Sequence, residues 1–133
     1  MAEVVGAILI DGGNILLGLR APHKSFAGCW DVIGGHVEPG ETPWSALRRE
    51  LSEELGIECR EGRRIATVML PCAGRPTVVL HIYAVRSWLG EPSVRNDEHA
   101  AIGWFTLQEA CALHLASSHY RRLFASLREP EPR

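Results

Sequence analysis

Four glutamates lie close together in the stretch GGHVEPGETPWSALRRELSEELGI, which covers residues 34–57. Glu50, Glu53 and Glu54 are spaced i, i+3 and i+4, so they share one face of a helix, next to a stripe of leucines. Glu41 precedes this helix and can fold back toward the same face. Like charges at this spacing repel, so the cluster needs an explanation other than helix stability.

A solvated acidic helix face is the ordinary meaning of such a charge run. Three features favour a metal site instead. The carboxylates adjoin the apolar stripe, two of them lie late in the helix, where the helix dipole disfavours anions, and a glycine-rich loop lets backbone carbonyls approach. Clustered hard oxygen ligands are what Mg²⁺ or Mn²⁺ requires, and a bound divalent cation removes the repulsion. The residues alone leave Ca²⁺ open, although the EF-hand loop pattern is absent.

The same stretch resembles the signature of a known family. Read from Gly35, the sequence runs through five residues to Glu41 and through seven more to RELSEELGI. It matches every specified position of the Nudix box, G-x5-E-x7-R-E-U-x-E-E-x-G-U, where U is a bulky aliphatic residue. The matching residues are Gly35, Glu41, Arg49, Glu50, Leu51, Glu53, Glu54, Gly56 and Ile57. Chance agreement at background residue frequencies is on the order of one in ten million or less.

The resemblance implies an activity and a metal site. Members of this family hydrolyse a nucleoside diphosphate linked to another moiety, with Mg²⁺ or Mn²⁺ bound at the box. Carried onto this sequence, the resemblance implies Glu50, Glu53 and Glu54 as metal ligands and the carbonyl of Gly34 or Gly35 as a backbone ligand. Metal ions that bridge the pyrophosphate oxygens neutralise their charge and activate a water, whose proton goes to a nearby carboxylate.

Further catalytic residues are expected around this centre. The resemblance implies that Arg49 orients a glutamate through an ion pair, and that Glu41 supports the loop or binds metal through water. Glu98, in RNDEHAAIGWF, resembles an acidic residue that the family places shortly before a strand with an aromatic, as general base and metal ligand. The alternative is that Glu98 is an ordinary loop acid and that a box glutamate, Glu53 or Glu54, is the base.

Substrate contacts are expected from residues outside the helix. Arg20 ends the second predicted strand and resembles an arginine that many members place against the substrate phosphates; the alternative is a surface arginine. His36 follows the glycine pair and either contacts a phosphate or faces solvent. Phe26 precedes the third strand and is the candidate to stack on a nucleobase. Glu41 completes the predicted substrate-binding set.

Hydrophobic periodicity and turn residues predict the elements that must position these groups. Thr42, Pro43 and Gly56 mark the start and the end of the central helix, whose leucines recur every four residues. The predicted strands are residues 4–10, 15–20, 29–35, 63–70, 77–88 and 102–106, and the predicted helices are 43–55, 107–116 and 118–128. The strand aromatics expected in the core are Trp30, Tyr83, Trp104 and Phe105.

This order of elements favours an α/β fold with a mixed β-sheet sandwiched between α-helices, which is also the Nudix fold that the resemblance implies. We expect a single Nudix domain over residues 1–128 and a flexible C-terminal tail over residues 129–133.

Composition narrows the class of protein. The chain has 133 residues, of which 46% are hydrophobic and 23% charged, which is typical of a globular chain. A net charge of −2 argues against a nucleic-acid polymer as partner, whereas a free nucleotide needs only a local site with its own cations. Four cysteines without a C-x-x-C pair, and an N-terminus without a signal peptide or membrane span, predict reduced thiols in a cytoplasmic protein. The oligomeric state stays open between monomer and homodimer.

The expected reaction is Mg²⁺-dependent hydrolysis of a pyrophosphate bond in a nucleoside diphosphate derivative. The chain length resembles that of small MutT-like pyrophosphohydrolases, so we expect a (d)NTP or an oxidised (d)NTP to be cleaved to the monophosphate and pyrophosphate. ADP-ribose and dinucleoside polyphosphates are the alternative substrates. A domain that only senses a nucleotide is the alternative class of protein, although such domains usually have an eroded box and this box is intact.

Overall fold

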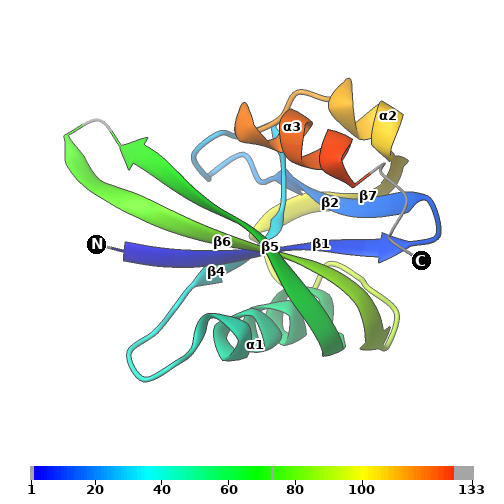
Figure 1. The fold of residues 1–133 in the computed structure, drawn as a ribbon, viewed down its shortest axis with the longest axis horizontal. Helices are drawn as coiled ribbons and strands as arrows, with labels where there is room; N and C mark the ends of the chain where they lie inside the picture. Colours follow the sequence, from blue (N-terminus) through cyan, green and yellow to red (C-terminus); the bar gives the residue numbers. More distant parts are fainter. Residues whose placement is uncertain (1, 73, 128–133) are drawn as a thin grey trace.

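A mixed sheet lies between one helix on one face and two helices on the other in this computed structural model, which describes residues 2–72 and 74–127 (Figure 1). The strands are β1 (Ala2–Asp11), β2 (Asn14–Arg20), β3 (Trp30–Asp31), β4 (Ile33–His36), β5 (Glu58–Cys72), β6 (Arg75–Leu89) and β7 (His99–Thr106). The helices are α1 (Pro43–Leu55), α2 (Leu107–Cys111) and α3 (His119–Ser126). The predicted fold class, a mixed sheet sandwiched between helices, is confirmed.

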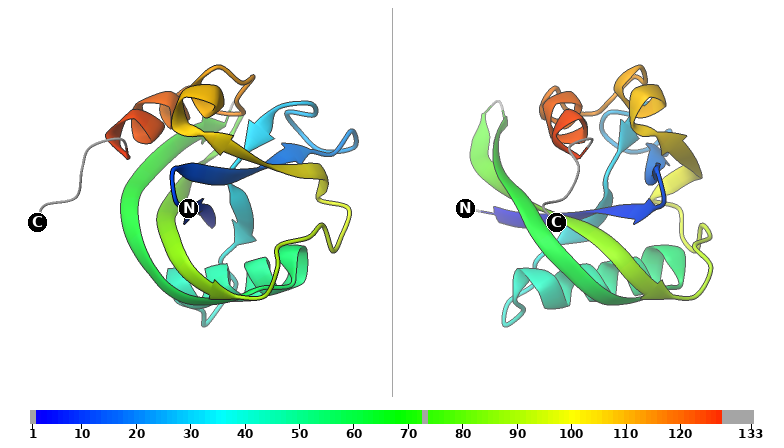
Figure 2. Two further views of the ribbon diagram at one scale, coloured as in Figure 1. Left: turned by 90° about the vertical axis from the view of Figure 1, so that its right-hand side faces the viewer. Right: turned by 45° about the vertical axis from the view of Figure 1, so that its right-hand side comes forward.

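The sheet has the strand order β3-β2-β1-β6-β5, with β4 paired to β1 and β7 paired to β2. The β1–β6 pair is parallel, and the other pairs are antiparallel. Figure 2 shows the long β5–β6 hairpin curving from the layer of α1 to the layer of α2 and α3. Both strands of this hairpin, and β7 as well, are longer than predicted.

Strand β1 changes its neighbour along its length. Its first half pairs with β4, from Val4 opposite His36 to Ala7 opposite Ile33, and its last residues, Leu9–Asp11, pair with β2. The single strand predicted over residues 29–35 is therefore wrong, because β3 pairs with β2 and β4 with β1. The switch of partner places the end of β3 and the glycines of β4 beside one another.

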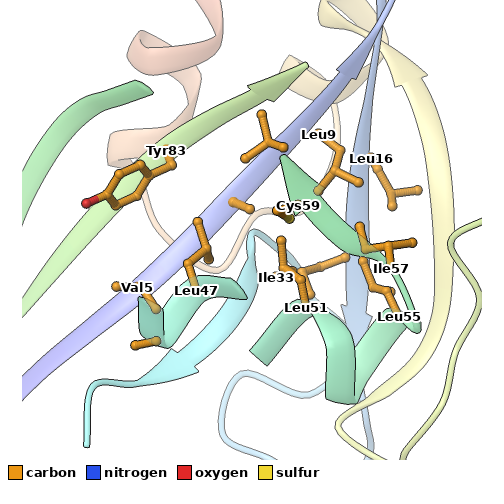
Figure 3. Packing of buried hydrophobic residues seen from close by; sticks show 13 residues of the cluster. Val5, Leu9, Leu16, Ile33, Leu47, Leu51, Leu55, Ile57, Cys59 and Tyr83 are labelled. Carbon is orange, nitrogen blue, oxygen red and sulfur yellow. The ribbon is translucent and has the colours of Figure 1, made fainter. Parts of the chain in front are cut away.

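Helix α1 begins and ends as the sequence predicts. The hydroxyl of Thr42 accepts from the Ser45 N–H at 3.1 Å, and the hydroxyl of Ser45 accepts from the Thr42 N–H at 3.0 Å. Pro43 takes the first helical position, and Gly56 ends the helix with a left-handed φ of 70°. The leucine stripe of α1 faces the sheet (Figure 3).

Two cores hold the layers together. The first lies between the sheet and α1 and includes Leu47, Leu51 and Leu55, which are at most 1% exposed (Figure 3). The second lies between the other sheet face and the C-terminal helices, and Phe124 is its largest fully buried side chain. Fixing α1 on the sheet through three leucines also fixes the height and rotation of its glutamates.

The C-terminal segment differs from the prediction. Helix α2 ends at Cys111 instead of residue 116, because the chain then runs beside β3: the Trp30 N–H donates to the His114 carbonyl at 2.8 Å, and the Ala116 N–H donates to the Trp30 carbonyl at 2.9 Å. Ser118 precedes α3 without a capping side-chain hydrogen bond, and the His119 N–H donates instead to the Ser117 hydroxyl at 3.2 Å. The proposed tail, residues 129–133, lies outside the described residues.

The aromatic predictions hold for three of the four residues. Tyr83 belongs to the first core, and Trp30 and Phe105 pack against the second. Trp104 is 38% exposed, so its assignment to the core is wrong. It lies on β7, which pairs with β2, and its ring stacks on that of Trp88 with the ring centroids 6.2 Å apart.

The cysteines with described side chains, Cys29, Cys59 and Cys111, are free thiols, as expected. Within the two described ranges, every helix is too short or too polar to cross a membrane.

Candidate active site

A cleft of about 480 Å³ opens where β4, α1 and the loops after β2 and before β7 meet. Its lining includes the carboxylates of Glu50, Glu54 and Glu98 and the backbone of Gly34 and Gly35. These five residues come from three separate stretches of sequence. The pairing of β4 with β1, the pairing of β7 with β2 and the packing of α1 on the sheet bring them to one place. The cleft therefore contains acidic groups that the sequence predicts as metal ligands.

Glu54 is a buried carboxylate whose charge is not balanced by a hydrogen-bonded partner. Its residue is 3% exposed, and its Oε2 has no hydrogen-bond partner among the described residues. Its Oε1 lies 3.8 Å from Nδ1 of His99. Burial, with the nearby charges of Glu50 and Glu98, raises the pKa of Glu54 to about 8. A buried oxygen left in this condition is costly unless a cation reaches it.

Glu50 lies directly beside β4. A Cβ atom at Gly35 would be 2.4–2.6 Å from the three atoms of the Glu50 carboxylate, so only glycine leaves room for it. Nη1 of Arg49 contacts Oε1 of Glu50 at 2.9 Å. Burial raises the pKa of Glu50, and the hydrogen bond from Arg49 offsets part of this effect.

Arg49 joins the helix to the loop before it. Its Nε contacts Oε2 of Glu41 at 2.8 Å, and its Nη2 contacts Oε1 at 2.9 Å, which is a bidentate ion pair. The same guanidinium donates to the His36 carbonyl at 3.0 Å and lies 3.4 Å from Oε2 of Glu53. The hydrogen bonds from Arg49 lower the pKa of Glu41 to about 2. Arg49 thus connects β4, the loop and α1 at once.

Glu98 ends the loop that precedes β7. Its Oε2 lies 2.8 Å from Nζ of Lys24, its N–H donates to Oδ1 of Asn96 at 3.1 Å, and its carbonyl accepts from the Ala21 N–H at 3.3 Å. The side chain is 42% exposed and faces the cleft that Glu54 also lines. The structure therefore brings Glu98 to the carboxylates of α1, as the sequence predicts.

The donor groups of the cleft suit a divalent cation. In residues 2–72 and 74–127, no three His, Cys, Asp or Glu side chains are already arranged around a common point. Arg49 holds Glu50 and Glu53, and Lys24 holds Glu98. The orphaned oxygen of Glu54 and the hard oxygen donors beside it nevertheless fit Mg²⁺ or Mn²⁺.

The other predicted substrate residues have different surroundings. Arg20, Phe26 and His36 line the cleft, whereas Glu41 is outside the lining and is the partner of Arg49. The guanidinium of Arg20 contacts Oδ2 of Asp31 at 3.1 Å and the backbone and hydroxyl of Ser25, so it supports the loop after β2. Phe26 is 64% exposed, which leaves its ring free to contact a ligand.

Asp31 and Tyr120 form a polar pair in the cleft that sequence reasoning missed. The Tyr120 hydroxyl donates to Oδ1 of Asp31 at 2.6 Å, and the Val32 N–H donates to the same oxygen at 2.8 Å. Burial raises the pKa of Asp31. No sequence signal joins residues 89 positions apart.

His99 is a second residue that the sequence did not single out. It is 8% exposed and lies against Gly18, where a Cβ would be 2.4–2.9 Å from the imidazole ring. Burial lowers the pKa of His99, so the ring beside Glu54 is neutral near pH 7. Its position directly after Glu98 is the sequence signal that could have found it.

Known proteins resemble this chain in sequence and in fold. A family model described as "NUDIX domain" matches residues 2–127. A protein of Escherichia coli strain K12 named "CTP pyrophosphohydrolase" is 39% identical over 134 residues, covering 99% of this chain and 97% of the relative. A protein of Mycobacterium tuberculosis named "Putative 8-oxo-dGTP diphosphatase 2" is 37% identical, covering 80% of this chain and 74% of the relative.

Solved structures share the fold. The solution structure of the E. coli ORF135 protein superposes with a TM-score of 0.85 at 38% identity, covering 99% of this chain and 94% of the other. The MutT NUDIX hydrolase from Burkholderia pseudomallei gives a TM-score of 0.82 at 31% identity, covering 96% of this chain and 98% of the other. With the box intact and the family matched across the described chain, the protein belongs to the Nudix family and is a MutT-like hydrolase acting on acid anhydrides.

Proposed function

We propose that the protein hydrolyses a nucleoside triphosphate to the monophosphate and pyrophosphate, with Mg²⁺ at the cleft. The observation that carries this proposal is Glu54, a buried carboxylate with an unpartnered oxygen in a cleft that Glu50 and Glu98 share. Such an oxygen is stabilised by a divalent cation, and a pyrophosphate is the substrate whose charge that cation neutralises.

The metal ligands in this proposal are Glu50, Glu53, Glu54 and the Gly34 carbonyl, with Glu98 from the facing loop. Bound Mg²⁺ supplies neutralisation of the phosphate oxygens and lowers the pKa of a coordinated water. Arg49 holds Glu50, which lines the cleft, and Glu53, which lies outside its lining, through a guanidinium that also binds Glu41. Arg49 is therefore a positioning residue in this scheme.

The proton of the attacking water passes to a carboxylate of the cleft. Glu98 is reached from solvent and is 42% exposed, whereas Glu54 is buried with a pKa of about 8 in the metal-free chain. We assign the general base to Glu98, because its exposed carboxylate can pass a proton on to solvent, whereas the carboxylate of Glu54 is enclosed. Water adds to the α- or the β-phosphorus; the α–β bridging oxygen then leaves with pyrophosphate in the first case and with the monophosphate in the second, and the released proton goes to solvent through Glu98.

Other residues of the cleft lining support the choice of substrate class. Phe26 offers an exposed aromatic ring for base stacking, and Asp31 with Tyr120 offers polar groups nearby. The relatives named for CTP and 8-oxo-dGTP support a nucleoside triphosphate, in ordinary or oxidised form. A relative from Mus musculus named "Bis(5'-nucleosyl)-tetraphosphatase [asymmetrical]", 31% identical over 105 residues, keeps dinucleoside polyphosphates as the second candidate.

The test is hydrolysis of a nucleotide panel in Mg²⁺, with chromatography of the products. The panel holds the NTPs, the dNTPs, 8-oxo-dGTP, ADP-ribose and diadenosine polyphosphates. We expect a monophosphate and pyrophosphate from one or more triphosphates, and a loss of about a hundredfold or more in kcat for Glu54→Gln and for Glu98→Gln. Glu91→Gln, on the exposed part of the same loop as Glu98, is the control and keeps full activity. Metal-dependent binding without any cleavage would show a nucleotide sensor instead.

A further inference from the structure

Two loops that border the cleft are tied together by their side chains. Nζ of Lys24, in the loop after β2, lies 2.8 Å from Oε2 of Glu98, in the loop before β7. One residue earlier on each loop, Nε2 of His23 lies 3.7 Å from Oδ2 of Asp97. The Ala21 N–H also donates to the Glu98 carbonyl at 3.3 Å. The base of the loop after β2 is thus fixed by its backbone, and Lys24 reaches Glu98 from it.

Lys24 is a cation placed inside an acidic cleft. It lines the cleft with Glu50, Glu54 and Glu98, and its side chain is 32% exposed. The cleft is also lined by Arg20, whose guanidinium is occupied by Asp31 and Ser25. Within the described residues, Arg20 and Lys24 are the arginine and the lysine of the cleft lining; Arg20 contacts two residues, whereas Lys24 is paired with Glu98 through a flexible side chain.

Lys24 contacts Glu98, to which the proposed function assigns two roles, as a metal ligand and as the general base for the attacking water. A divalent cation and an ammonium group compete for Glu98, because their positive charges repel when both contact one carboxylate. The phosphate chain of a nucleotide enters the same cleft with negative charge of its own. If metal and nucleotide bound together, the metal would take Glu98 as a ligand, and Lys24 would be left with a phosphate oxygen as its partner.

We propose that Lys24 exchanges partners during binding: it neutralises Glu98 in the nucleotide-free enzyme and donates to the phosphate chain of the bound metal–nucleotide complex. Lys24 is then a substrate-binding residue that also sets the metal affinity of the free enzyme. This inference rests on the proposed function, since it takes a polyphosphate as ligand. Its consequence is that free metal binds weakly and that metal with nucleotide binds well, which favours entry of the two together.

The first arm of the test measures Mn²⁺ binding to the nucleotide-free protein by calorimetry. We expect Lys24→Met to bind Mn²⁺ about three- to tenfold more tightly than the unmodified protein, because a competing positive charge is gone. Lys24→Arg keeps the charge and stays near the original affinity. His23→Gln, which removes the neighbouring contact between the same two loops but leaves Lys24, is the matched control and binds Mn²⁺ as the unmodified protein does.

The second arm measures kcat and KM for the best triphosphate of the panel. We expect Lys24→Met to raise KM about tenfold and to change kcat less, since a charge-assisted contact to phosphate is lost. The double variant Lys24→Met, Glu98→Gln should bind Mn²⁺ as tightly as Glu98→Gln alone does, because the carboxylate that the lysine and the metal share is gone. The double variant should still bind the nucleotide more weakly than Glu98→Gln does, as measured by calorimetry in Ca²⁺.

The outcomes separate this inference from the proposed function. If Lys24→Met binds Mn²⁺ no more tightly than the unmodified protein, the exchange is overturned and Lys24 is a fixed support of Glu98. The same conclusion follows if His23→Gln raises the Mn²⁺ affinity as much as Lys24→Met does. An unchanged KM overturns the contact to phosphate. A wild-type protein that cleaves no nucleotide refutes the proposed function, while the Mn²⁺ arm still decides whether Lys24 competes for Glu98. If Lys24→Met fails to fold, Lys24→Gln takes its place.

Discussion

Gly35 on β4 leaves the space that the Glu50 carboxylate of α1 occupies. A Cβ at position 35 would be 2.4 Å from Cδ, 2.5 Å from Oε1 and 2.6 Å from Oε2 of Glu50, and real Cβ atoms do not approach so closely. Gly35 does not have a left-handed φ, so backbone conformation is not the reason for glycine here. The reason is contact between a strand and a helix that come together at the cleft.

Gly35→Ala should therefore damage activity more than stability. The carboxylate is the flexible end of a long side chain and can move aside, but it then leaves its place in the cleft. We expect kcat/KM to fall about a hundredfold, the usual effect of a displacement of about 1 Å at a reacting centre, while the melting temperature changes little. Steady-state kinetics and thermal unfolding measure the two effects.

Gly13→Ala is the matched control for Gly35→Ala. Its added Cβ has no heavy atom within 4 Å, and its φ is not left-handed. This variant should keep both activity and melting temperature. Equal activity of the two alanine variants would show that the position of Glu50 does not matter for turnover.

Arg49→Lys should reduce activity although it keeps the positive charge. Arg49 contacts both oxygens of Glu41 and reaches Glu50 and the His36 carbonyl with one rigid fork. A lysine ammonium cannot span these acceptors at once, so the glutamates lose their common anchor. We expect metal affinity and kcat/KM to fall about ten- to a hundredfold, as for other residues that orient metal ligands.

Arg48→Lys is the control for this change. Arg48 makes a single contact of 3.6 Å to Glu58, and both side chains are about half exposed. Such a pair contributes little, so activity and metal affinity should stay unchanged. If Arg49→Lys also binds Mn²⁺ normally and turns over at the original rate, the fork has no positioning role.

The stability of the metal-free protein should fall as pH rises from about 6.5 to 8. The pKa of Glu54 is raised to about 8 in the folded chain, so the folded state keeps a proton that the unfolded state releases near pH 4.5. Each pH unit in this window shifts the folding equilibrium toward the unfolded state by up to about tenfold. Burial lowers the pKa of His99, so this residue makes the free energy of unfolding rise with pH below pH 6.5. The measurement is therefore made above pH 6.5.

Urea unfolding at a series of pH values in EDTA tests this slope. Glu54→Gln carries no titrating carboxyl and should flatten it, whereas Glu53→Gln, at a residue whose side chain is 56% exposed, should leave most of it. Saturating Mg²⁺ should also flatten the slope, because the metal then balances the ionised Glu54. A slope that persists in Glu54→Gln would assign it to another group.

The sequence predicts the helix of this site better than the strands around it. The capping residues, the leucine stripe and the box act over short distances along the chain, and α1 follows them residue by residue. The split of residues 29–35 into β3 and β4 was not predicted, because both halves read as one apolar run and their partners are set by the fold. Helix α2 is shorter than predicted for the same reason, since β3 takes the backbone groups of residues 114–116.

The site divides in the same way. Motif spacing finds the glutamates and Arg49, which lie within one helix and the loop before it. Lys24 and the pair of Asp31 with Tyr120 were missed, because each depends on a contact between segments distant in sequence. Arg20 was placed on the cleft correctly, but its guanidinium contacts Asp31 and Ser25, which no pattern around position 20 reveals.

Tyr120→Phe should test the pair that the sequence did not show. The hydroxyl of Tyr120 donates to Oδ1 of Asp31 at 2.6 Å, and both groups are shielded from water. Removing it leaves a buried carboxylate with the Val32 N–H and Arg20 as remaining partners, so the free energy of unfolding should fall by about 1–3 kcal/mol.

Tyr83→Phe is the control. It removes a hydroxyl in the other core for which the described chain shows no hydrogen bond, so the free energy of unfolding should fall by less than half as much. Because Asp31 also lines the cleft beside Phe26, Tyr120→Phe should raise KM for the nucleotide as well, while Tyr83→Phe leaves KM unchanged. Equal losses of stability in the two variants, with KM unaffected in both, would show that the Tyr120–Asp31 contact neither stabilises the fold nor shapes the cleft.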